Sequence, residues 1–241
     1  YGSDQAHHSI LRGARMAGIP IKNVRMIPSD SDCRISLVAL EKQIQKDRKK
    51  GLKPFLLVGA GGTVTTGAVD DLTALARIAK RYKLWFHTDA AWAGAFPLTR
   101  QGSKLMAGMG LSDSITIDPH KVLFMPFGCG ALIVRDKGAL KRAFQIQMSV
   151  NYLPTRDTGE SDSWNPSDTS PELSRTVRGL QVWLPLKMLG IQPFADALEE
   201  KLQLAHYATR ELIKISGVEL FCEPQLCIIA FRFTKKGVRE K

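Results

Sequence analysis

Apolar runs of strand length alternate with amphipathic helical segments along most of this chain of 241 residues. "PFLLVGAGG" (54–62), "LWFHTDAAW" (84–92) and "SITID" (114–118) have the length and composition of buried strands. Between the first two, residues 70–83 repeat apolar side chains at helical spacing, with Asp70 or Asp71 as the N-cap. Continuous apolar strands separated by helices indicate an α/β fold with a mostly parallel sheet covered on both faces.

The C-terminal third has a different pattern. Residues 151–171 are polar and rich in turn-forming residues, which is typical of a functional or disordered loop. Two long helical stretches follow, and then 218–234 read as two strands with a turn at Pro224. We therefore expect a large domain over residues 1–190, with its N-terminal part missing, and a truncated start of a smaller α+β domain over 191–241.

The formal net charge of +11 comes largely from two basic clusters, at 46–53 and 235–241. No aromatic residues interleave them, so solvated helix ends and loops are the better interpretation, and we expect no nucleic-acid partner. No apolar run is long enough to span a bilayer, and the first residues do not resemble a signal peptide. The four scattered cysteines lack zinc spacing, which favours reduced thiols, no metal site and a cytoplasmic protein.

Three residues near predicted strand ends could carry chemistry: Lys121, Asp89 and His7. A lysine amine forms a Schiff base with an aldehyde when it is deprotonated and held in place, and the apolar "VLFM" after Lys121 would limit its hydration. A His-Lys pair is nevertheless more often structural. Asp89 could instead cap the following helix, and His7 could be a core residue, a general acid or a ring stacked on another ring.

Together these segments resemble the group II pyridoxal-phosphate-dependent decarboxylases, which include aromatic amino acid, histidine and glutamate decarboxylases. The family's cofactor-lysine signature is matched at Ser114, Ile115, Lys121, Val122, Leu123, Phe127, Cys129, Leu132 and Arg135. "SDQAHHS" resembles its Ser-x-x-x-His segment, and "HTDAAWAG" its His-x-Asp-Ala-Ala-x-Gly segment. The resemblance covers nearly the whole chain, and family members are roughly twice as long.

The resemblance implies a type I PLP-dependent transferase fold and pyridoxal 5'-phosphate as the cofactor. Lys121 would bind the cofactor aldehyde as a Schiff base. Asp89 would pair with the pyridine nitrogen and keep it protonated, because a nearby carboxylate favours the charged ring. His7 would stack on one face of the ring, with Ala91 against the other.

Three more roles follow from the same resemblance. His120 would help to hold the phosphate, and Thr63 would lie near the cofactor in "GGTVTTG". Tyr152, in the long loop, would deliver a proton to Cα after decarboxylation, and closure of that loop would exclude water.

The sequence departs from the family pattern at two positions. Asp118 stands where the aromatic branch usually has Asn before Pro-His-Lys, and a carboxylate repels a phosphate, so we assign Asp118 no phosphate role. Val64 replaces the second threonine of the family's Gly-Thr-Thr.

The resemblance predicts decarboxylation of an L-amino acid to an amine and CO2 by a homodimer with a shared active site. Aromatic amino acids are the first expectation for the substrate, and glutamate or diaminobutyrate the next. Two alternatives stay open: another reaction on the same fold, such as that of a lyase or an aldehyde synthase, or a catalytically silent truncated homologue.

Overall fold

The structure is a computed structural model that describes residues 1–144 and 166–234. Its centre is a four-stranded sheet in the order β3-β4-β5-β6. β3 (Leu56–Ala60), β4 (Trp85–Asp89) and β5 (Ser114–Ile117) are parallel, and β6 (Ala131–Val134) is antiparallel to β5. The predicted mostly parallel sheet is confirmed.

The strand register brings the functional ends of the strands together. Ala60 pairs with Asp89, and Asp89 pairs with Thr116. The carboxyl ends of the three parallel strands therefore share one edge, where parallel sheets bind ligands.

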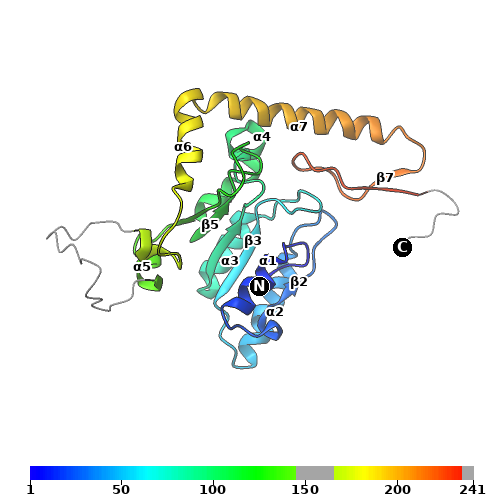
Figure 1. Ribbon diagram of the computed structural model, residues 1–241. Helices are drawn as coiled ribbons and strands as arrows, with labels where there is room; N and C mark the ends of the chain where they lie inside the picture. The colour runs from blue at the N-terminus through cyan, green and yellow to red at the C-terminus, as the bar shows by residue number, and fades with distance from the viewer. Residues whose placement is uncertain (145–165, 235–241) are drawn as a thin grey trace.

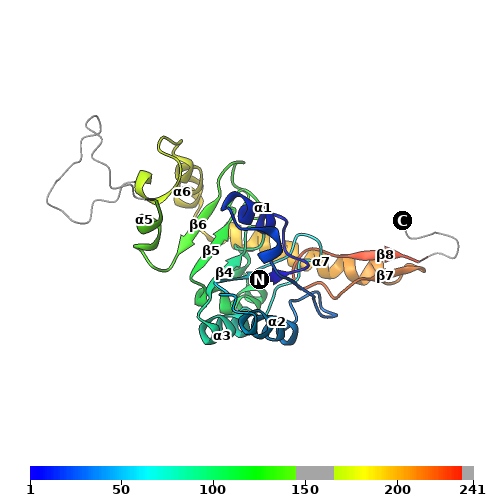
Figure 2. The same cartoon turned by 90° about the horizontal axis from the view of Figure 1, so that it is seen from below.

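Helices cover the sheet on both sides (Figure 2). α2 (Leu37–Lys49) and α3 (Leu72–Tyr82) lie on one face, and α1 (Ser9–Met16) lies on the other. The first face is tightly packed, because α2 and α3 insert apolar side chains against the strands. The fully buried members of this cluster include Leu40, Ile44, Leu57, Leu72, Leu75 and Phe86. α1 itself has no buried residue.

The two neighbouring aspartates before α3 have different tasks. Asp71 is the N-cap, and its carboxylate accepts the N–H of Ala74 at 2.9 Å. Asp70 is 2% exposed and accepts the N–H groups of Ile35 and Ala60, each at 2.7 Å. Asp70 thereby ties the loop before α2 to the end of β3.

A small parallel pair, β1 (Gly2–Ser3) and β2 (Met26–Ile27), lies beside β3. Asp47 of α2 anchors this region, because it accepts hydrogen bonds from Arg25, Gln43 and the Tyr1 hydroxyl. Between β4 and β5 the chain forms short helical segments: η2 (Phe96–Leu98), α4 (Arg100–Leu105) and η3 (Ala107–Leu111).

After β6 come α5 (Ala139–Phe144), η4 (Pro166–Thr169), α6 (Arg178–Leu189), α7 (Gln192–Leu212) and the antiparallel hairpin of β7 (Val218–Leu220) and β8 (Phe231–Phe233). Figure 1 shows α7 running across one end of the molecule and the hairpin extending beyond the sheet. Leu198 and Leu202 of α7 belong to the same hydrophobic cluster as the sheet. No helix among the described residues is long and apolar enough to cross a bilayer.

Candidate active site

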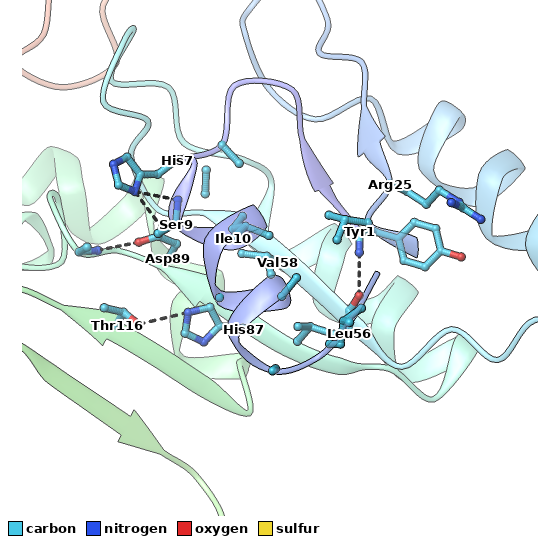
Figure 3. A pocket seen from close by; sticks show the side chains of 18 of the residues that line it. Tyr1, His7, Ser9, Ile10, Arg25, Leu56, Val58, His87, Asp89 and Thr116 are labelled. Atoms are coloured by element: carbon cyan, nitrogen blue, oxygen red, sulfur yellow. Dashed lines mark hydrogen bonds between the residues drawn. The ribbon is translucent and has the colours of Figure 1, made fainter. Parts of the chain in front are cut away.

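A cavity of about 700 Å³ lies between α1 and the strands β3, β4 and β5. Figure 3 shows it from close by, with His7 and Asp89 toward one end and Tyr1 and Arg25 toward the other. Lys121, Asp89, Ala91, His7 and Thr63 all line it. Five of the residues predicted from the sequence are thus brought together, although they come from four separate segments of the chain.

One face of β4 and β5 supplies the polar wall of this cavity. Side chains alternate along a strand, so His87 and Asp89 of β4 project to the same side, as do Ser114 and Thr116 of β5. The imidazole of His87 lies 2.8 Å from Ser114 Oγ through Nδ1, and 3.2 Å from Thr116 Oγ1 through Nε2. Both ring nitrogens are therefore occupied, which fixes the orientation of the imidazole.

Asp89 is the last residue of β4 and faces the cavity. Its Oδ1 accepts the N–H of Ala91 at 3.2 Å, which caps the turn that follows the strand. This bond uses one carboxylate oxygen and leaves Oδ2 to meet a ligand. The capping interpretation and the cofactor interpretation of Asp89 are consequently compatible.

Lys121 lies in the turn that follows β5. Its Nζ is 2.8 Å from Asp118 Oδ2, and 36% of the side chain remains exposed among the described residues. Val122 and Leu123 pack against the central hydrophobic cluster. The apolar residues after Lys121 therefore anchor the turn that carries the amine.

His7 is exposed at the rim of the cavity. Its Nδ1 accepts the backbone N–H of Ser9 at 3.3 Å and lies 2.8 Å from Ser9 Oγ. The ring also contacts His8, at 4.0 Å between centroids. His7 is thus held from below by the start of α1, and its ring is available at the cavity entrance.

The other predicted residues are placed differently. His120 is next to Lys121 in sequence, but its Nδ1 lies 2.6 Å from the carbonyl oxygen of Cys129 and its ring packs edge-on against Phe127. It is not among the residues that line the cavity. Thr63 is buried, and its hydroxyl bonds to Thr66 Oγ1 and to the N–H of Ala68. Tyr152 lies outside the described residues.

His87 lines the cavity, and the sequence reasoning assigned it no role. Burial lowers its pKa below the ordinary value, and the carboxylate of Asp89 partly opposes this shift. The signal was present in the sequence, because His87 stands two residues before Asp89 in the same strand and so shares its face.

The cavity fits pyridoxal phosphate in size and in chemistry. Its volume lies within the range of small-molecule sites. It presents a primary amine on Lys121 for an aldehyde and a carboxylate on Asp89 for a ring nitrogen. Ala91 leaves room for a flat ring near the backbone.

Comparisons with known proteins agree with this assignment. Residues 1–234 match the family model described as "Pyridoxal-dependent decarboxylase conserved domain". The chain is 35% identical over 233 residues to an aromatic-L-amino-acid decarboxylase of Bacillus atrophaeus, covering 97% of this chain and 48% of that protein. It is 34% identical over 242 residues to a cysteine sulfinic acid decarboxylase of Mus musculus, covering 100% of this chain and 49% of that protein.

The fold comparison gives the same result. The crystal structure of Oryza sativa TDC with PLP and tryptamine superimposes with a TM-score of 0.91 at 26% identity, over 97% of this chain and 48% of that one. This confirms the expected type I fold of PLP-dependent enzymes, and pyridoxal phosphate is the cofactor of the family. The chain spans about half the length of the relatives it matches. The cavity, the fold and the matched residues lead to one conclusion: this chain belongs to the pyridoxal-dependent decarboxylase family.

Proposed function

We propose that the full-length protein catalyses the pyridoxal-phosphate-dependent decarboxylation of an L-amino acid to an amine and CO2. The observation that carries this proposal is the convergence of Lys121, Asp89, Ala91 and His7 on one cavity at the carboxyl edge of the sheet. The resemblance of the sequence to the family supports the role of each residue.

The bound cofactor would supply an electron sink for the electron pair released when CO2 leaves. Lys121 provides the amine that links the protein to the cofactor aldehyde. Asp89, whose Oδ1 is oriented by the N–H of Ala91, would keep the ring nitrogen of the cofactor protonated through its negative charge. His7, at the cavity entrance, would cover one face of the ring, and Ala91 would lie against the other.

Return of a proton to the substrate carbon is the proposed task of Tyr152. The support for this step is the resemblance to the family, in which the loop after the cofactor lysine meets the substrate. The loop would also exclude water when it closes, and this favours decarboxylation over side reactions.

For the substrate we propose an aromatic amino acid. The part of the cavity wall formed by α1 and β3 is mostly apolar, with Ile10, Ala14 and Val58 among its residues. Arg25, which also lines the cavity, is already paired with Asp47 in two hydrogen bonds. An acidic amino acid is the second candidate, because the mouse relative is named for cysteine sulfinic acid.

We further propose a cytoplasmic homodimer with a shared active site, and a smaller domain that begins near residue 191. The four described cysteines form no disulfide with one another, which supports the compartment. The exposed apolar side chains of α6, including Leu180, Trp183 and Met188, support the presence of a further contact surface.

The test compares the full-length protein with Lys121→Ala and a matched control, Lys104→Ala, at an exposed position of α4. We expect the wild type and the control to be yellow with bound cofactor and to release CO2 from an aromatic amino acid. Lys121→Ala should lose the absorbance and at least about 1,000-fold in rate, the scale seen when a covalent catalyst is removed. Normal decarboxylation by Lys121→Ala would refute the proposal. An aldehyde product from the wild type would identify an aldehyde synthase instead.

A further inference from the structure

Asp118 departs from the family pattern, and in the structure it contacts the amine on which the proposed reaction depends. Its Oδ2 lies 2.8 Å from Lys121 Nζ. The two side chains are 19% and 36% exposed and both line the cavity. Of the carboxylates that the structure describes on the cavity wall, Asp89 and Asp47 make other contacts, and Asp118 alone pairs with Lys121.

The local backbone holds this ion pair in place. The N–H of Asp118 bonds to the carbonyl of Ala91 at 3.0 Å, which fixes Asp118 to the turn after β4. The N–H of Lys121 bonds to the carbonyl of Asp118 at 2.9 Å, which closes a tight turn between the two residues. Because only this turn separates them, little chain entropy opposes the pair.

Gly130 provides a second, independent indication that the fold makes room for this carboxylate. A Cβ at position 130 would lie 2.9 Å from Asp118 Oδ1, closer than carbon and oxygen normally approach. Gly130, the residue before β6, therefore packs directly against the carboxylate. One oxygen of Asp118 rests on Gly130, and the other points to Lys121.

We infer that Asp118 is a positioning residue, which holds the Lys121 amine in this ion pair whenever that amine is not bonded to a carbonyl group. An amine attacks an aldehyde through its lone pair, and an ammonium that donates to a carboxylate has none to offer. Asp118 thus pairs with Lys121 in the free protein. The ion pair would form again once a substrate amine has replaced Lys121 on the carbonyl group. Only the identity of the aldehyde rests on the proposed function.

Besides this pair, Asp89, His87 and His7 line the cavity, together with Tyr1, Arg25, Asp47 and Lys53. His87 hydrogen-bonds to Ser114 and Thr116. His7 hydrogen-bonds to Ser9, and Asp89 accepts a hydrogen bond from Ala91. Replacement of Asp118 by Asn therefore removes the negative charge next to Lys121 with little change in shape and without disturbing these bonds.

The test measures the reactivity of Lys121 in the cofactor-free full-length protein. Formaldehyde forms an imine with a free amine and releases water, and cyanoborohydride reduces that imine to a methylamine. Peptide mass spectrometry then gives the methylation rate of Lys121 at fixed pH and low salt, relative to exposed lysines of the same chain. The variants are Asp118→Asn, Asp118→Glu and the surface control Asp136→Asn, whose partner is Arg142.

We expect Asp118→Asn to methylate Lys121 about fivefold faster than the wild type, which corresponds to about 1 kcal/mol, the upper end for partly exposed ion pairs. Asp118→Glu should restore most of the restraint, and Asp136→Asn should leave Lys121 unchanged. High salt should accelerate the wild type but not Asp118→Asn, because salt screens the pair. Equal rates in the wild type and Asp118→Asn would overturn the inference.

The methylation test can be completed even if one variant fails to fold, and its result is independent of the decarboxylation test. If Asp118→Asn fails to fold by circular dichroism, Asp118→Ser and the salt dependence of the wild type carry the same comparison. Because methylation uses formaldehyde, it does not depend on cofactor binding or decarboxylation. Failure of the Lys121→Ala test would remove the proposed function, whereas failure here would remove only the role of Asp118.

Discussion

Replacing the buried carboxylate of Asp70 by an amide is expected to destabilise the edge of the sheet that forms the site. In the wild type, Asp70 uses both oxygens to accept backbone N–H groups, from Ile35 and Ala60. In Asp70→Asn one of those N–H groups faces an amide NH2, so two donors meet and neither is satisfied. The segment that then loses its anchor is either the loop before α2 or the end of β3.

The structure allows the size of this effect to be worked out. A hydrogen bond to a charged acceptor contributes about 1.5–3 kcal/mol, and a buried unsatisfied N–H costs about 1–3 kcal/mol. The two costs partly describe the same loss and are therefore not fully additive. We expect Asp70→Asn to lower the free energy of unfolding by about 2–4 kcal/mol at pH 7.5.

The cost should also depend on pH in a specific direction. Burial raises the pKa of Asp70 to about 6, against the opposing effect of the two N–H donors. A raised pKa means that the folded state binds the proton more tightly, so this group adds stability below its unfolded pKa and loses it as the pH rises through 6. The wild type should gain about 1.4 kcal/mol from this group between pH 7.5 and pH 5, one pH unit below 6. The Asn variant cannot gain it, so the cost of the substitution should grow on acidification.

Urea unfolding followed by circular dichroism at pH 7.5 and pH 5 measures both quantities. The matched control is Asp71→Asn, the neighbouring position, where asparagine caps a helix about as well as aspartate and the cost should stay near 0.5 kcal/mol or below. Wild-type stability in Asp70→Asn at pH 7.5, or a cost that shrinks at pH 5, would refute the reasoning.

Three further predictions follow from the same contacts. Asp47→Ala should lower the free energy of unfolding by about 2–4 kcal/mol, because it leaves the guanidinium of Arg25 without its carboxylate partner. Arg25 lowers the pKa of Asp47 to about 2, so in urea melts the contribution of Asp47 is present above about pH 4 and fades as the pH falls toward 2. His87→Gln should reduce the loss of Tm between pH 7 and pH 5 in thermal scans, since burial lowers the pKa of His87 and the folded wild type resists protonation there. Gly62→Ala should lower the free energy of unfolding, measured by urea denaturation, by about 2–4 kcal/mol. The reason is that φ of Gly62 is 116° and a Cβ there would lie 2.5 Å from Ala93 Cβ.

The sequence predicted the parts of the fold that depend on periodic patterns. The apolar run ending at Asp89 and the helical repeat after Asp71 specify a strand and a capped helix by local rules, and both are confirmed. The location of the site follows from them, because strand ends in a parallel sheet meet at one edge.

Features that depend on side-chain direction or on distant partners could not be predicted. The apolar run 131–134 fits a parallel or an antiparallel strand equally well, and only pairing with β5 fixes its direction. Asp70 and Asp71 are indistinguishable as caps until Ile35 and Ala60 are placed. His120 stands beside Lys121 in sequence, but the turn directs its ring toward Cys129.

The alternation of side chains on β4 and β5 has a consequence for how this protein can change. Phe86, Thr88 and Ile115 point to the packed helices, whereas His87, Asp89 and Thr116 point to the cavity. Alternate residues of one strand thus pack in the core and line the cavity. Substitutions at 87 and 116 can accumulate and alter what the cavity accepts without opening a void in the core, so the site can diversify while the scaffold stays constant.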